Sequence, residues 1–88
     1  MKVIELNVAA LDVRYGGLRV RDRRREAQLM TSLEEHGQQD AISVIAEGDG
    51  RWVVVDGHKR VRALRRLRRD VAKAVVLEMP PAEALAAV

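Results

Sequence analysis

The residues best suited to chemistry form one short run, Asp56-Gly57-His58-Lys59-Arg60, at the end of an apolar segment. Where a buried strand passes through glycine directly into a helix, the helix start presents unpaired backbone N–H groups and a partial positive charge, and both suit an anion. Glycine also lets a ligand approach the backbone closely. The run therefore predicts a phosphate-binding turn.

Two cations in the first helical turn strengthen this prediction. Lys59 and Arg60 face the positive end of the helix dipole, which disfavours each cation by roughly 0.3–1 kcal/mol. A bound phosphate would offset that cost through charge-assisted hydrogen bonds to both side chains. The alternative is that Asp56 caps the helix and pairs with the cations, which leaves the turn without a ligand.

Catalytic and metal sites are weakly indicated. His58 and Asp56 are the only candidates for acid or base chemistry at the turn, and spacing identifies no partner for either one. We therefore expect no catalytic residue and regard His58 as a surface or ligand-contacting side chain. Because half of the other acidic residues fall on an expected hairpin turn or on the first helix and the rest are scattered along the chain, we expect no metal site built from protein ligands.

Four short runs predict strands. Alternation over residues 2–6 indicates an edge strand, and the Ile- and Val-rich runs 41–46 and 51–56, separated by a glycine-containing segment, indicate a β-hairpin. Residues 71–79 supply a fourth strand, whereas residues 11–21, with Gly16-Gly17, predict a loop. The expected fold is α/β (α+β), a small mixed sheet of about four strands with two main helices.

Two amphipathic helices are expected to cover this sheet. Residues 22–36 have Asp22 as N-cap, Gly37 as the stop and an apolar face of Ala27, Leu29, Met30 and Leu33. The helix after Gly57 buries Val61, Leu64 and Leu67 and leaves Arg62, Arg65, Arg66 and Arg69 off that stripe. Pro80-Pro81 ends the last strand, so we expect one domain over 1–79 and, over 80–88, the start of a C-terminal helix of a longer protein.

The arginines are clustered although the net charge is only +3. Two basic groups favour polyanionic partners, with DNA or nucleotide phosphate ahead of an anionic membrane. The expected nucleic-acid contacts are Arg19, Arg21, Arg23, Arg65, Arg66 and Arg69, which would bind backbone phosphates with steep salt dependence and little sequence discrimination. The alternative is an arginine-rich composition with no binding role.

Several classes of protein are excluded or disfavoured by composition. The chain has no cysteine, so disulfides and thiolate chemistry are excluded. No apolar run approaches the roughly 18 residues of a membrane span, and the N-terminus lacks the apolar core of a secretory signal. We expect a cytoplasmic protein without a membrane partner.

The turn also resembles a known family. The ParB-like domain has a strand followed by Gly-Glu-Arg-Arg-x-Arg-Ala at the start of a helix, and here the run is Gly57-His58-Lys59-Arg60-Val61-Arg62-Ala63. Upstream, Glu35-His36-Gly37-Gln38-Gln39 before Ala41-Ile42-Ser43-Val44 resembles the family segment in which a helix ends at glycine and glutamine precedes a strand. The similarity extends from Leu11 to Met79. The chain thus resembles the N-terminal domain of the ParB/sulfiredoxin superfamily.

The resemblance implies a phosphate pocket at the helix start, which chromosome-partitioning relatives use to bind CTP with magnesium and to act as a DNA clamp. The matching positions are Gly57, Lys59, Arg60 and Arg62, with His58 in place of the family glutamate and Gln38 near the nucleotide. The CTP–magnesium cofactor is thus an expectation from the resemblance. Sulfiredoxin activity is excluded because its catalytic cysteine is missing.

Three functions follow from these observations. The leading one is a phosphate- or nucleotide-binding ParB-like module of a DNA-binding protein, related to partition or transcription, for which a homodimer is left open. The second is an enzyme, a nucleotide hydrolase or nuclease that uses the same turn, with His58 or Asp56 assisting. The third is an interaction domain whose basic helix binds an acidic protein.

Overall fold

The structure is a computed structural model that describes residues 2–15 and 23–78. In chain order the elements are β1 (Val3–Asn7), a short 3-10 helix η1 (Val8–Ala10), β2 (Leu11–Asp12), α1 (Arg23–His36), β3 (Ile42–Ala46), β4 (Trp52–Asp56), α2 (His58–Arg66) and β5 (Val71–Val76). The mixed fold class and the two main helices are confirmed. The boundary expected at residue 79 and the helix expected over 80–88 lie outside the described residues.

The strands form a single mixed sheet in the order β1-β5-β3-β4-β2. β1 pairs with β5 and β3 with β4 in antiparallel fashion, whereas β3–β5 and β2–β4 are parallel. The expected hairpin and the edge position of the first strand are confirmed. The sheet has five strands rather than about four, because Leu11 and Asp12 pair with the start of β4. A strand of two residues is too short for alternation to reveal it.

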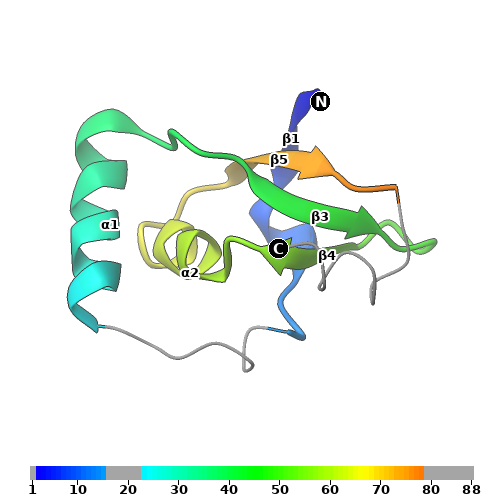
Figure 1. The fold of residues 1–88 in the computed structure, drawn as a ribbon, viewed down its shortest axis with the longest axis horizontal. Coiled ribbons are helices and arrows are strands. Elements are labelled where there is room, and N and C mark those ends of the chain that lie inside the picture. Colours follow the sequence, from blue (N-terminus) through cyan, green and yellow to red (C-terminus); the bar gives the residue numbers. More distant parts are fainter. Residues whose placement is uncertain (1, 16–22, 79–88) are drawn as a thin grey trace.

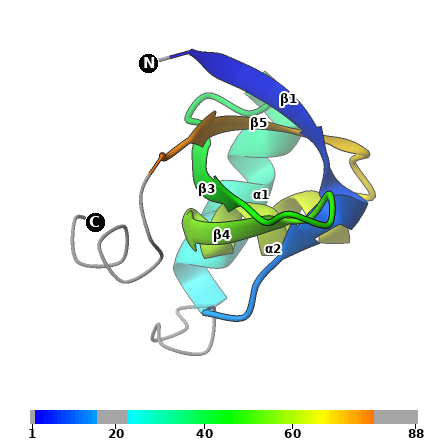
Figure 2. The ribbon, with the colours of Figure 1, turned by 90° about the vertical axis from the view of Figure 1, so that its right-hand side faces the viewer.

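α2 lies between α1 and the sheet (Figures 1 and 2). The side chains of Val61 and Leu64 from α2 join Ile42, Val44 and Val54 from the two central strands in the main hydrophobic core. The central strands are fully buried at these positions. Because α2 follows β4 after one glycine, its first turn is held against the middle of the sheet.

α1 ends as expected and buries a different face. The N–H of Gly37 donates to the carbonyl of Leu33 at 2.9 Å, and its φ of +72° is the left-handed conformation typical of a helix stop. Leu33 is buried, but Ala27 is exposed and its neighbour Glu26 is only 6% exposed. The expectation that Ala27 is buried is wrong, because Glu26 faces a basic side chain of α2. Asp22, the expected N-cap, lies outside the described residues.

No helix in the described ranges is long and apolar enough to cross a membrane.

Candidate phosphate-binding turn

Gly57 joins β4 to α2 in a conformation that requires glycine. It is the N-cap residue of α2 with φ +95° and ψ 25°, in the left-handed region. A Cβ at this position would lie 2.7 Å from Cγ2 of Ile42, well inside van der Waals contact. Glycine is therefore required here by the fold itself, since it lets the turn pack directly on β3.

The first turn of α2 has the properties of an anion site. The first intrahelical bond runs from the N–H of Val61 to the carbonyl of Gly57 at 3.0 Å, so the N–H groups of residues 58–60 have no acceptor within the helix. The first turn contains no acidic residue. Lys59 and Arg60 thus add their charge to the positive end of the helix dipole.

His58 is buried, with only 4% of its surface exposed. Of the two expected roles, the surface position is therefore wrong, and ligand contact stays a prediction. The reason is its spacing, because His58 precedes Val61 by three residues and Leu64 by six and so continues their buried stripe. At this position the imidazole belongs to the buried face of α2.

Arg60 forms an ion pair with an exposed acid, Asp40. Its Nη2 lies 3.2 Å from Oδ2 of Asp40, and the side chains are 31% and 75% exposed, respectively. An ion pair this exposed is weak, on the order of 0–1 kcal/mol. Arg60 therefore remains accessible to a phosphate, which would compete with Asp40 for the guanidinium.

Gln38 is held by the backbone of β5. Its Oε1 accepts the N–H of Lys73 at 2.7 Å, and its Nε2 donates to the carbonyls of Lys73 and Asp40 at 2.9 and 2.8 Å. Both ends of the amide are thus engaged in fastening the segment before β3 to the sheet. Through Asp40, Gln38 is linked to Arg60, so the structure brings these two predicted residues into one hydrogen-bonded network.

Arg62 connects the two helices. Its Nε and Nη2 donate to Oε1 of Glu26 at 3.0 and 2.6 Å, and the Glu26 side chain is only 8% exposed. A phosphate that uses Arg62 must share it with this buried carboxylate. Glu26 was not singled out from the sequence, although a lone acid at the start of a helix among three arginines is a signal for such a pair.

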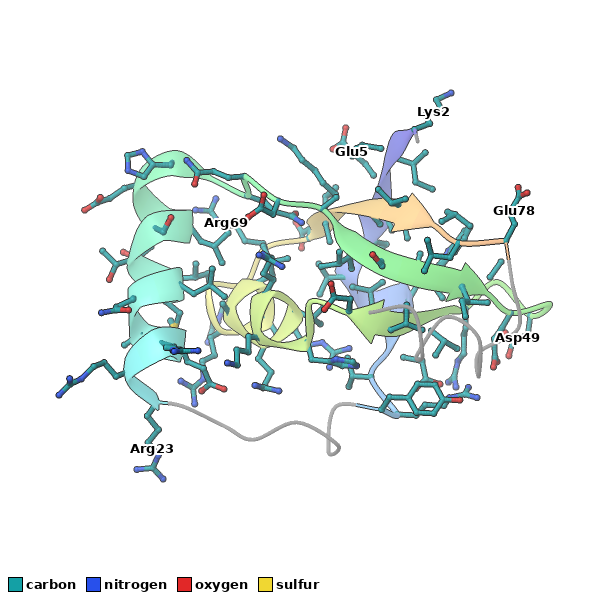
Figure 3. The ribbon with its side chains drawn as sticks, in the orientation of Figure 1. Lys2, Glu5, Arg23, Asp49, Arg69 and Glu78 are labelled. Atoms are coloured by element: carbon teal, nitrogen blue, oxygen red, sulfur yellow. The ribbon has the colours of Figure 1, made fainter. Side chains whose placement is uncertain are left out.

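Those expected nucleic-acid residues that fall in the described ranges do not form one surface. Arg66 lies with Lys59 and Glu26 where α1 and α2 meet, while Arg65 and Arg69 line a separate groove beside η1. Figure 3 shows Arg23 at the first turn of α1, away from Arg69. Arg19 and Arg21 lie outside the described residues.

The described residues include no group of three acidic or histidine side chains that could hold a metal ion. Asp56 is half-buried at the end of β4, next to the glycine turn. Catalysis by Asp56 or His58 stays a prediction, as do hydrolase and nuclease activity.

Solved structures share this fold. A C-terminally truncated ParB from Caulobacter crescentus, in complex with CTP-γ-S, superposes with a TM-score of 0.86 at 22% identity and covers 99% of this chain and 50% of its own. The same protein bound to the centromeric parS site gives 0.74 at 22% identity, covering 93% and 42%. Sulfiredoxin from Arabidopsis thaliana gives 0.77 at 24% identity, covering 90% and 88%.

The present chain spans about half the length of the first of these ParB structures. A search of the curated proteins finds no match. The family model of the ParB N-terminal domain matches residues 1–88, the whole chain. The chain therefore belongs to the ParB N-terminal domain family.

Proposed function

We propose that this chain is the nucleotide-binding module of a ParB-type DNA-binding protein, and that it binds CTP with the triphosphate on the turn at Gly57. The observation that carries the proposal is the first turn of α2, which offers backbone N–H groups together with Lys59 and Arg60 and contains no acidic residue. The relative crystallised with CTP-γ-S and with parS supports both the nucleotide and the DNA partner.

The turn would bind the phosphates in two ways. The N–H groups of residues 58–60 donate to phosphate oxygens at the positive end of the helix. Arg60 gives up its exposed contact with Asp40 and forms charge-assisted hydrogen bonds to the phosphate, while Lys59 contributes a second charge. Magnesium would be held mainly by phosphate oxygens and water, which is the usual manner for this ion.

The test is a calorimetric titration of the 88-residue chain with the four nucleoside triphosphates, with and without magnesium. CTP is expected to bind, and Arg60→Ala to weaken binding by about 10- to 100-fold, because a hydrogen bond to a charged group is worth about 1.5–3 kcal/mol. If no nucleotide binds saturably, the proposal is wrong.

A substitution of Asp40 is expected to change CTP affinity in the opposite direction to Arg60→Ala. Asp40→Asn removes the competitor for Arg60 and is expected to tighten CTP binding up to about fivefold, the equivalent of a surface ion pair. Asp49→Asn, in the β3–β4 turn, removes the same charge away from the site and is the matched control. Equal effects of the two variants would mean that only net charge matters and that Arg60 is not a ligand.

A further inference from the structure

The C-terminal end of α2 holds an arginine in a backbone conformation that favours glycine. Arg68 has φ +56° and is the only described residue other than glycine with positive φ. The N–H of Arg68 donates to the carbonyl of Arg65 at 3.1 Å and that of Arg69 to Leu64 at 2.9 Å. These two bonds form a Schellman motif, in which the left-handed position is usually glycine.

Arg68 lies on a basic groove. Arg65, Arg68 and Arg69 line a groove of about 280 Å³ together with the chain at Asn7, Val8 and Ala9, and Asp70 is its one acidic residue. Figure 3 shows Arg69 beside the turn that leads from α2 to β5. The groove therefore carries an excess of two positive charges, and Arg66 is not among the residues that line it.

The arginines of this groove differ in how they are held. Arg65 is anchored, because its Nη2 donates to the carbonyl of Leu11 at 2.9 Å. Within residues 2–15 and 23–78, no side-chain hydrogen bond or ion pair engages Arg68 or Arg69. Two guanidinium groups are thus available to a ligand beside a third that is already positioned.

The helix dipole does not explain Arg68. Cations are favourable near a helix C-terminus, and Arg65 and Arg66 already supply them within the last turn. Glycine at residue 68 would remove the backbone strain, whereas arginine retains it. Strain kept at an exposed, charged position is a sign of function.

We propose that this groove is a second anion site, separate from the turn at Gly57, which binds the phosphodiester backbone of nucleic acid. Guanidinium forks match pairs of phosphate oxygens, and the groove contains arginine but no lysine. An acidic protein fits less well, since the only apolar side chains in the groove are those of Val8 and Ala9 and no aromatic residue lines it as an anchor. This inference goes beyond the nucleotide-binding function and does not require it.

The experiment measures binding of the 88-residue chain to a fluorescein-labelled mixed-sequence duplex of about 20 base pairs by anisotropy, from about 20 to 200 mM salt. Arg69→Gln and Arg68→Gly are each expected to weaken binding and to reduce the slope of log affinity against log salt by about one. Arg51→Gln, which removes an exposed arginine of the β3–β4 hairpin that does not line this groove, is the matched control and should leave the slope unchanged.

Arg68→Gly separates binding from folding. It is expected to raise the Tm by about 4 °C, because strain is relieved, while it weakens duplex binding. A variant that is more stable yet binds less cannot be explained by damage to the fold. Duplex binding that is unchanged in Arg68→Gly and Arg69→Gln, or weakened equally in Arg51→Gln, would overturn the proposal.

CTP and Arg60→Ala distinguish this site from the turn. Arg60→Ala should leave the slope of log duplex affinity against log salt unchanged. Saturating CTP should not displace the duplex from the groove. Displacement by CTP that depends on Arg60 would overturn the separation of the two sites. If CTP fails to bind at all, the nucleotide-binding proposal fails. The duplex titrations then still test whether the groove binds nucleic acid.

Discussion

Replacing Gly57 by alanine tests how the turn is built. Two costs can be worked from the structure. A side chain at φ +95° costs about 1 kcal/mol net, after allowing for the smaller entropy of the unfolded alanine chain. The added Cβ would also lie 2.7 Å from Cγ2 of Ile42, a fully buried side chain, and overpacking of this kind costs about 1–3 kcal/mol.

We therefore expect Gly57→Ala to lower the free energy of unfolding by about 2–4 kcal/mol. A domain of this size has a total of roughly 4–13 kcal/mol, so the variant should still fold. Urea unfolding followed by the fluorescence of Trp52, the single tryptophan, gives the free energy. Gly50→Ala is the matched control, because Gly50 has φ +84° and nothing within 4 Å of an added Cβ.

Gly50→Ala should cost only about 1 kcal/mol. A second comparison uses Ile42→Leu, which moves the methyl branch away from Cβ and by itself costs less than about 1.5 kcal/mol. In this background the penalty of Gly57→Ala should shrink by about 1 kcal/mol or more. If Gly57→Ala costs no more than Gly50→Ala, or if Ile42→Leu gives no relief, the packing of the turn on β3 is not what requires glycine.

Three further predictions concern the contacts around the turn. Arg62→Met should lower the free energy of unfolding by up to about 3 kcal/mol, because the buried Glu26 carboxylate loses its two hydrogen bonds from Arg62. The double variant Glu26→Leu/Arg62→Met should stay within about 1 kcal/mol of the wild type in urea unfolding. A double variant as unstable as Arg62→Met would contradict this. Gln38→Ala removes three hydrogen bonds to the backbone and should lower the free energy of unfolding by about 1–3 kcal/mol. Hydrogen exchange at the Lys73 amide of β5, which donates to Gln38, should become faster. Unchanged exchange at Lys73 would contradict the proposal that Gln38 holds this segment to the sheet. The side-chain hydrogen bond from Arg14 lowers the pKa of Asp12 below its ordinary value of 3.8. The ionised Asp12 therefore stabilises the fold fully above pH 3.8, and this stabilisation is lost as the pH falls through the lowered pKa. Asp12→Asn should therefore reduce the fall in the free energy of unfolding at acid pH, and an unchanged pH dependence would refute a stabilising role of the Asp12–Arg14 pair.

Much of the fold follows from patterns of adequate length. The helix stop at Gly37, the β3–β4 hairpin and the stripe of Val61 and Leu64 were predicted because periodicity and turn residues agree there. The strand Leu11–Asp12 was missed, since its partner β4 lies about 40 residues further along the chain and two residues carry no pattern of their own.

The candidate site was predicted less completely, because side-chain pairing depends on tertiary structure. The burial of Glu26 against Arg62 requires α1 to pack on α2, which no local pattern reveals. The burial of His58 was available in principle, from its spacing to Val61, but a histidine at a helix start is typically read as polar surface. The division of the arginines between two sides of α2 depends on where η1 and α1 pack, and only the structure gives it.

The most direct test of the central claim is a ¹H–¹⁵N correlation spectrum of the labelled chain during titration with CTP and magnesium. If the triphosphate sits on the turn, the largest and saturable shifts will be at the amides of Gly57, His58, Lys59 and Arg60, whose N–H groups begin α2. Shifts that are absent, or that are confined to residues away from this turn, would contradict the account.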